Sequence, residues 1–447
     1  MAANMQGDLF SRGFPRYDES CYFFSISDDQ QRASDFVKRL AQAAKNGEIS
    51  SLQKVLADWD KVDANTSGTT LPITNVLVAF TMQGLMKAFN QAGSNETTFT
   101  ATWDRTAGTV VEKQVRNDQH KHDMFCPGTA YDAKGRLVIS GGVSSASTTV
   151  YESLSDSWRP ADILNIPRGY QGSTTFGDGR IFVIGGSWAP EEAEKRGNKN
   201  GAMFDPDEGA RTWHEIDDCP AKPLQTTSDW QDDYRNDNHI WLFSWKDNSI
   251  FHAGPAKQMK WITVTGRKGA VKPAGPRAEP NNLADGDAMC GVAVMYDATN
   301  GKILSTGGAP QYKICNDETN GDAKMHQPST KNAFVITLKE ANGTVQAGTL
   351  QLKEAAGSMK FERIFHNAVV LPNGSIFVVG GQLRGQGFTD QPPRLTPEIY
   401  TPEKGAVKDS WQSVAPHSTV RVYHSFALLL PSCKKTTISN FCLSNLP

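Results

Sequence analysis

Four residues in this chain have side chains that could support metal and redox chemistry. Cys126 lies in the segment HDMFCPG, Tyr170 lies in PRGYQGS, and Tyr423 and His424 are neighbours in VRVYH. Imidazole and phenolate suit Cu(II), which favours a tetragonal set of nitrogen and oxygen donors. Each residue also has a simpler interpretation, as an inert buried thiol or as an aromatic residue of the core. The choice depends on whether the fold brings the four residues together.

An internal repeat organises most of the chain. Its unit is an apolar strand, a turn of Asp or Asn with Gly, a second apolar strand and a Gly-Gly pair. Four copies are YDAKGRLVISGG (131–142), FGDGRIFVIGGSW (176–188), YDATNGKILSTGG (296–308) and LPNGSIFVVGGQ (371–382). Such turns join hairpins, and one unit cannot bury both faces of its sheet, so the units must stack side by side. The repeat predicts a β-propeller. An all-β sandwich is the alternative, but it does not explain the repeated Gly-Gly.

Aligning the repeats gives the candidate residues a common position. Cys126, Tyr170 and Phe365 precede the first glycine of their own Gly-Gly pairs, at Gly141, Gly185 and Gly380, by the same spacing. The segment VYHSFALLLP (422–431) aligns with IFHNAVVLP (364–372), which places Tyr423 on Phe365 and His424 on His366. Equivalent positions on the inner strands of a propeller surround its axis. We therefore expect Cys126, Tyr170, Tyr423 and His424 to meet there. We expect His239, His252 and His366 to be structural.

Residues 1–95 lack this repeat. Their apolar spacing predicts strands at 20–27 and 72–80 and helices at 34–46 and 82–93. This is a small α+β fragment of ferredoxin-like type. The expected division of the chain is therefore 1–95 for the fragment, 96–431 for an incomplete propeller and 432–447 for a tail without the repeat.

From about residue 97 to residue 431 the chain resembles galactose oxidase, a family of secreted fungal copper-radical enzymes. The segments that carry the resemblance are those quoted above together with YRNDNHIWLFSWK (234–246), DAMCGVAVMYDA (287–298) and TPEIYTPE (396–403). The resemblance implies a kelch-type propeller, seven-bladed in the family and incomplete here. It also implies oxidation of a primary alcohol, galactose or a similar one, to an aldehyde while O₂ is reduced to H₂O₂.

The resemblance also implies a role for each matching residue. Tyr170 is the expected equatorial copper ligand and radical site, joined to Cys126 by a thioether, and Trp188 is the indole that covers this pair. Tyr423 is the expected axial tyrosine and base, and His424 is a copper ligand. The expected substrate contacts and pocket residues are Gln231, Arg235, Tyr312 and Phe388. Lys313 stands where the family has a glutamine in its substrate pocket.

Two departures from the family shape the expectation for activity. The second histidine ligand of the family comes from a C-terminal domain, and no remaining histidine of this chain lies in a matching motif. We therefore expect weak copper binding and impaired turnover in the chain as written. The alternative function is a kelch scaffold that binds protein or sugar without chemistry, or the remnant of a fused gene model.

Residues 5–92 resemble the start of a dye-decolourising peroxidase, through MQGDLFSRGFPRYDESCYFFSIS (5–27) and LPITNVLVAFTMQGLMKAF (71–89). The haem-binding half of that family has no counterpart here, and FGDG (176–179) is explained as a repeat turn. We therefore expect no haem and no peroxidase activity.

Charge and hydropathy limit the partners. The chain of 447 residues has 46 Lys plus Arg against 48 Asp plus Glu, without a basic stripe, which argues against nucleic acid. Its longest aliphatic run, 426–430, is too short for a membrane span.

Unpaired sheet edges of an open propeller could support self-association. The family is secreted, but the first residues contain no apolar signal-peptide core, so the chain as written is expected to be intracellular or to have a mispredicted N-terminus.

Overall fold

A computed structural model of the chain gives the backbone of four N-terminal strands and most of the chain that follows. The described residues are 23–27, 75–81, 98–104, 109–115, 122–124, 127–152, 155–187, 199–206, 212–226, 235–236, 240–246, 249–277, 286–310, 328–339, 350–355, 357–385, 392–423, 425–429 and 441–444. Regular structure in these residues is almost entirely β-strand, with a short 3₁₀ helix at Lys222–Leu224. None of the helices in this part is long and apolar enough to cross a bilayer.

Five antiparallel sheets, each of four strands, follow one another along the chain. The first contains β5 (Gly128–Tyr131), β6 (Leu137–Ser140), β7 (Thr148–Glu152) and β8 (Ser157–Pro160). The second contains β9 (Gly172–Thr175), β10 (Ile181–Ile184), β12 (Ala202–Phe204) and β13 (Trp213–Glu215). The third contains β15 (Trp241–Trp245), β16 (Ser249–Gly254), β17 (Gln258–Thr265) and β18 (Lys268–Pro276). The fourth contains β19 (Val292–Asp297), β20 (Lys302–Thr306), β21 (Ala333–Leu338) and β22 (Leu350–Glu354). The fifth contains β23 (Ile364–Val370), β24 (Ile376–Gln382), β25 (Glu398–Thr401) and β26 (Ser410–Ser413).

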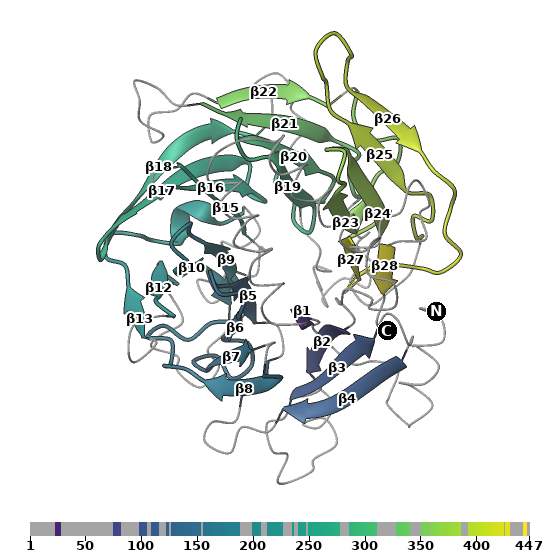
Figure 1. Cartoon of the computed structure of the whole chain (residues 1–447). Helices are drawn as coiled ribbons and strands as arrows, with labels where there is room; N and C mark the ends of the chain where they lie inside the picture. Colours follow the sequence, from purple (N-terminus) through teal and green to yellow (C-terminus); the bar gives the residue numbers. More distant parts are fainter. Residues whose placement is uncertain are drawn as a thin grey trace, which may run out of the picture.

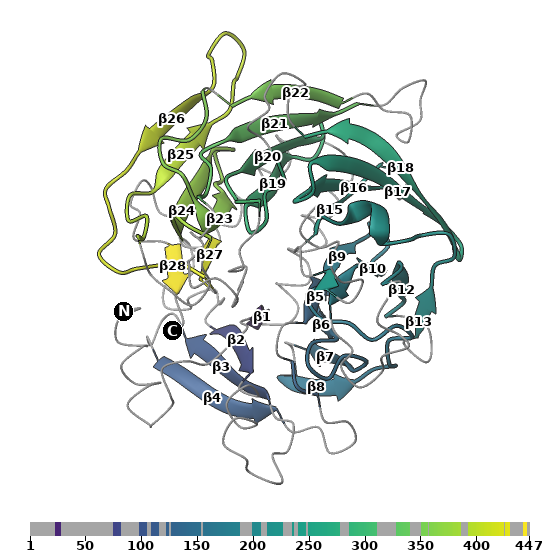
Figure 2. The same cartoon turned by 180° about the vertical axis from the view of Figure 1, so that it is seen from behind.

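These sheets are arranged around a common centre. The first strand of each sheet (β5, β9, β15, β19 and β23) lies toward the middle, and the last strand lies at the periphery (Figure 1). The view from behind shows the same radial order (Figure 2). The fold is therefore β-propeller-like, as the repeat predicts. Strand β27 (Phe426–Leu429) follows β23 at the centre and pairs with β28 (Phe441–Ser444). The sequence predicts no strand in the tail that supplies β28.

A further four-stranded sheet combines the N-terminal segment with the repeat region. Its order is β1 (Phe23–Ser27), β2 (Asn75–Thr81), β3 (Thr98–Asp104) and β4 (Thr109–Val115). The predicted strands at 20–27 and 72–80 are thereby confirmed. The expected division at residue 95 passes between β2 and β3, which pair along their whole length. This sheet lies between the β5–β8 sheet and the β27–β28 pair in both views (Figures 1 and 2). The predicted helices at 34–46 and 82–93 lie outside the described residues.

The hairpin turns have the predicted chemistry. Gly135, Gly179 and Gly374 have φ of 73°, 90° and 84°, which residues with a Cβ adopt at a cost. In the last of these turns the side chain of Asn373 accepts a hydrogen bond from the Ser375 N–H at 3.0 Å. Asp132 and Asp178 do the same in their turns, accepting from the backbone two residues on.

Among the described residues, three of the four Gly-Gly pairs join their sheet to the next one. The second glycine donates its N–H to the carbonyl of an arginine that precedes the next inner strand. The three links are Gly142 to Arg168 (2.9 Å), Gly308 to Arg363 (2.8 Å) and Gly381 to Arg421 (2.7 Å). A Cβ on the first glycine of these pairs would lie 2.0–2.6 Å from the same carbonyl oxygens. Only glycine therefore allows the sheets to approach this closely.

Two of these arginines also turn back onto their own sheet. Arg168 Nη1 donates to Gly185 O at 3.1 Å, and Arg363 Nη1 donates to Gly380 O at 2.7 Å. Both guanidinium groups are buried. Arg363 forms an ion pair with the buried Glu398 at 2.9 Å. The hydrogen bonds of Arg168 in the described residues go to carbonyl oxygens of residues 166, 185, 199 and 200.

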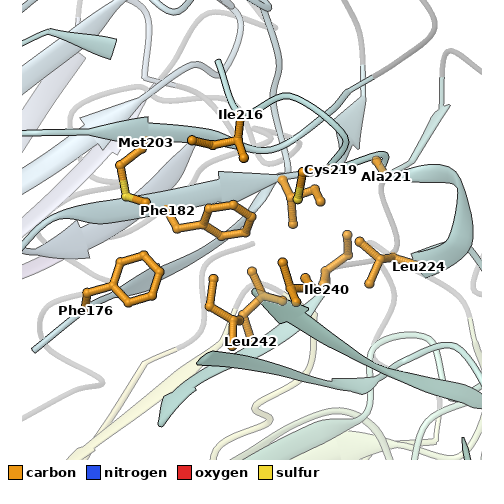
Figure 3. Packing of buried hydrophobic residues seen from close by; sticks show 12 residues of the cluster. Phe176, Phe182, Met203, Ile216, Cys219, Ala221, Leu224, Ile240 and Leu242 are labelled. Carbon is orange, nitrogen blue, oxygen red and sulfur yellow. The ribbon is translucent and has the colours of Figure 1, made fainter. Parts of the chain in front are cut away.

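Apolar side chains fill the space between neighbouring sheets. The cluster between the β9–β13 and β15–β18 sheets contains Phe176, Phe182, Met203, Cys219, Leu224, Ile240 and Leu242 among its members (Figure 3). On the outer strands an aromatic pair recurs in register: Tyr151 with Trp158, Phe204 with Trp213 and Tyr400 with Trp411, at ring-centroid distances of 4.6, 5.1 and 5.1 Å. In each of these sheets the two aromatic residues follow the Gly-Gly pair in the sequence.

Gly381 and Gly374 provide a test of how crowded a Gly-Gly pair is within its own sheet, because both have a φ of 84°. An added Cβ at Gly381 would lie 2.6 Å from the Ile364 carbonyl oxygen, whereas at Gly374 it would meet nothing within 4 Å. We expect Gly374→Ala to lower the free energy of unfolding by about 1–2 kcal/mol, and Gly381→Ala to lower it by more than about 3 kcal/mol. Urea denaturation measures both, and equal losses would contradict the steric argument.

Three buried histidines make the fold sensitive to acid. Burial lowers the pKa of His122 from 6.5 to about 4, and the pKa values of His252 and His366 from 6.5 to about 3. The unfolded chain binds these protons more readily than the folded protein does. The free energy of unfolding therefore falls as the pH drops below 6.5, and this contribution stops changing below about pH 3.

We expect each of these histidines to remove about 2 kcal/mol of stability between pH 7.5 and pH 5. The measurement is urea denaturation at the two pH values. His366→Gln, which cannot be protonated, should reduce the difference by the share of one histidine. A free energy of unfolding that is the same at pH 7.5 and pH 5 would refute the expectation.

Candidate active site

The candidate residues lie where the chain enters the inner strands. Tyr170 and Phe365, just ahead of β9 and at the start of β23, have positive φ values of 57° and 59°. The register predicted from the Gly-Gly spacing is therefore matched by a common backbone conformation. Cys290, just ahead of β19, has the same conformation with a φ of 55°. Positive φ is uncommon for residues with a Cβ, and at a functional site it indicates a position held by its surroundings.

Sequence spacing alone misses Cys290. It precedes its own Gly-Gly pair, at Gly307, by a longer stretch of chain than Tyr170 and Phe365 precede theirs. The turn of this hairpin is longer, and the pairing of β19 with β20 shifts register between Met295 and Asp297. A β-bulge of this kind adds a residue to one strand without moving the ends of the hairpin. The strand-entry position is therefore retained in space but not in residue count.

Tyr423 lies against the entry of the neighbouring sheet. Its ring contacts that of Phe365 edge to face, with centroids 4.7 Å apart. Both belong to a cluster with Met289, Ile364 and Cys290. Tyr423 is half-buried and, unlike Phe365, does not have a positive φ. Because the Gly-Gly link recurs before β9, β23 and β27, Tyr170, Phe365 and Tyr423 enter their strands at the same end of the ring.

Gly186 connects the surroundings of Tyr170 to another candidate. A Cβ on Gly186 would lie 2.4 Å from the Gly169 carbonyl oxygen and 3.1 Å from the Gln171 nitrogen, so this glycine packs on the backbone that flanks Tyr170. Gly186 belongs to β11 (Gly186–Ser187), which pairs with β14 (Arg235–Asn236). The backbone of Arg235 therefore lies beside Ser187, close to the Tyr170 segment although far from it in the sequence.

The segment that carries Cys126 lies next to the segment that carries Tyr170. A Cβ on Gly128 would lie 2.7 Å from Gln171 Nε2. Gly128 is two residues after Cys126, and Gln171 directly follows Tyr170. Gln171 Nε2 also donates to the Ser140 carbonyl oxygen at 2.7 Å and to Ser140 Oγ at 3.2 Å. Ser140 is paired with Gly128 across β5 and β6.

The bond from Gln171 to Ser140 has a counterpart further along the chain. His366, which directly follows Phe365, shares a hydrogen bond of 2.9 Å between its Nε2 and Thr306 Oγ1. Ser140 and Thr306 both directly precede the Gly-Gly pair of the preceding sheet. In the next sheet His424 holds the position of His366 in sequence, and the residue that precedes the Gly-Gly pair is Val379, which is buried and has no hydroxyl.

The remaining predicted site residues lie outside the described residues. They are Cys126, Trp188, Gln231, Tyr312, Phe388 and His424, and the structure gives only the backbone of Arg235. In the part of the chain that is described, three or more His, Cys, Asp or Glu side chains nowhere gather closely enough to hold a metal ion.

Two family models match parts of the chain. The model for the glyoxal oxidase N-terminus matches residues 314–439, and the model for the DyP dimeric alpha+beta barrel domain matches residues 4–155. The second match extends past β1–β4 into the β5–β8 sheet.

Curated relatives and a solved structure match a longer stretch. Galactose oxidase of Gibberella zeae is 45% identical over 334 residues, which is 75% of this chain and 44% of that protein. An aldehyde oxidase of Arabidopsis thaliana is 24% identical over 70% of this chain and 48% of that protein. A fungal alcohol oxidase of the AA5 family, solved in complex with copper, has a TM-score of 0.63 and 37% identity over 79% of this chain and 65% of that one. The chain spans less than half the length of the curated relatives it matches.

Proposed function

We propose that this chain holds copper through Tyr170, Tyr423 and His424 at the inner end of its sheets. The chain is a homologue of galactose oxidase over 75% of its length and belongs to the copper-radical alcohol oxidase lineage. The proposed reaction oxidises a primary alcohol, galactose or a similar one, to an aldehyde while O₂ is reduced to H₂O₂.

The comparison of His424 with His366 carries this proposal. The imidazole of His366 is bound to a hydroxyl of the preceding sheet at Thr306. At the matching place before His424 the sequence has Val379, which offers no hydrogen-bond partner. Where no such hydroxyl is offered, a metal ion can be the polar partner of an imidazole. Together with two phenolic side chains, His424 gives a set of nitrogen and oxygen donors that suits Cu(II).

The proposed residues divide the chemistry among themselves. Copper, when bound, supplies a one-electron couple. Tyr423 as phenolate accepts the proton of the alcohol hydroxyl. Tyr170, as a radical, accepts a hydrogen atom from the alcohol carbon and so provides the second one-electron store. Trp188 covers Tyr170, and Gln231, Arg235, Tyr312 and Phe388 line the substrate side.

The thioether between Cys126 and Tyr170 forms by oxidation. One hydrogen leaves the thiol and one leaves the phenol ring as the carbon–sulfur bond forms, and the two electrons and two protons reduce dioxygen to hydrogen peroxide. Support for this step comes from the contact of Gly128 with Gln171, because these residues flank Cys126 and Tyr170.

We assign the fold to the kelch-type propeller, which is seven-bladed in this family, with 96–431 as its incomplete form, 432–447 as a tail and 1–95 as a ferredoxin-like fragment of peroxidase type. Support comes from the radial sheets and from the match of residues 4–155 to the DyP model.

The proposed cofactors are copper and the thioether, without haem. The proposed partners are a small alcohol or carbohydrate and O₂, with self-association through sheet edges and without nucleic acid or a membrane. A kelch scaffold without chemistry is the competing proposal.

Copper binding separates the two proposals. We expect His424→Gln to weaken Cu(II) binding by roughly 10-fold or more, measured by titration with a competing chelator. The matched control is His366→Gln, the same substitution at the equivalent position one sheet earlier. It should leave copper affinity unchanged, because Thr306 rather than a metal is the partner of His366. Equal effects of the two substitutions would remove the argument for His424.

Peptide mass spectrometry and peroxide detection test the chemistry. After incubation with copper and air, the peptides of Cys126 and Tyr170 should be joined, with a loss of two hydrogen atoms. Cys126→Ser and Tyr170→Phe should each abolish both the joined peptide and H₂O₂ production from a primary alcohol. A wild-type protein that binds copper without either signal would favour the scaffold.

A further inference from the structure

We propose that Gln171 is a positioning residue for the Cys126–Tyr170 pair, and that its hydrogen bond to Ser140 sets the register in which the thioether forms. This inference rests on the proposed function, because it concerns the site at which that cofactor is made. No comparison assigns Gln171 a role.

Gln171 is buried and occupies space that two sheets leave for it. It is 7% exposed, and its Nε2 reaches the Ser140 carbonyl oxygen at 2.7 Å. A Cβ on Gly128 would lie within 2.8 Å of three of its side-chain atoms, and one on Gly141 would lie 3.1 Å from its Nε2. A Cβ at Gly128 would displace this side chain, and one at Gly141 would crowd its amide.

Gln171 connects the backbone beside Tyr170 to the strand that follows Cys126 in the sequence. Its own backbone continues that of Tyr170, which has a φ of 57°. Its partner Ser140 faces Gly128 across β5 and β6, and Gly128 is two residues from Cys126. Two hydrogen bonds therefore join this strand entry to the preceding sheet, one on each side of Tyr170. The first runs from the Gly142 N–H to the Arg168 carbonyl oxygen, and the second runs from Gln171 Nε2 to the Ser140 carbonyl oxygen. A carbon–sulfur bond forms only between atoms held at reaction distance, so a fixed register should speed it.

A second hydrogen bond between the same two sheets supplies a matched control. Trp213 Nε1 donates to Thr148 Oγ1 at 2.8 Å on the outer strands. Thr148→Val removes that acceptor without changing the size of the side chain. It should weaken the same interface while leaving the strand entry at Tyr170 alone.

The experiment follows cross-link formation by peptide mass spectrometry after copper and dioxygen are added to the copper-free full chain. Gln171→Ala and Gln171→Met are compared with the wild type and with Thr148→Val. Gln171→Met fills the space but has no N–H to donate, and so serves if Gln171→Ala fails to fold. Urea denaturation of each variant measures the stability lost.

We expect both Gln171 variants to slow cross-linking at least 10-fold, and Thr148→Val to cross-link at the wild-type rate although its denaturation midpoint falls. Cross-linking at the wild-type rate in Gln171→Met would overturn the inference and leave the proposed function standing. A slowing in Thr148→Val as large as in Gln171→Met would also overturn it, since general loosening of the interface would then explain the effect. If the wild type binds copper and forms no cross-link, the proposed cofactor fails, and the role of Gln171 fails with it.

Discussion

The fold depends on how closely one sheet can approach the next at its inner end. The peptide N–H of the second glycine in each pair reaches an arginine carbonyl of the following sheet at 2.7–2.9 Å in the three links found among the described residues. This distance requires that the first glycine of each of these pairs has no side chain. Since the ladder hydrogen bonds stay within each sheet, these links, a few side-chain hydrogen bonds and the apolar clusters between sheets fix the angle at which the next sheet follows. The positions of Tyr170, Phe365 and Tyr423 are a consequence of that angle.

Much of this could be predicted from the sequence, because the repeat has simple local causes. Asp or Asn with a following Gly produces the turns, and continuous runs of buried apolar residues produce the strands on the Gly-Gly side of the hairpins. A constant spacing to the Gly-Gly pair found the strand-entry position at Tyr170 and Phe365. It failed at Cys290, where a bulge and a longer turn change the count without moving the backbone. The arginine carbonyl links could not be predicted, because a backbone acceptor leaves no mark on residue type.

The N-terminal region shows a second limit of the sequence. Local apolar runs predict strands at 20–27 and 72–80, which the structure shows at 23–27 and 75–81, but they do not predict the partners, since pairing with β3 joins segments of different composition. Likewise β28 has no Gly-Gly to identify it. For the site, the repeat predicts that the strand entry at Tyr170 lies next to the strand that begins at Gly128. The contact of Gly128 with Gln171 depends on side-chain packing between two sheets and could not be predicted. His366 is buried with a hydroxyl partner, as expected for a structural histidine.

Arg168 has a consequence for the electrical potential around its neighbours. Burial lowers its pKa to about 9, so it still carries its charge at neutral pH. Its hydrogen bonds among the described residues go to peptide oxygens, which orient dipoles toward the charge but do not cancel it. Glu215 acts on it as an opposite charge, and a charge in the interior is screened less than one in water. Arg168 lies just ahead of β9 in the chain, so this positive potential acts at the inner end of that strand and favours an anion there over a neutral group.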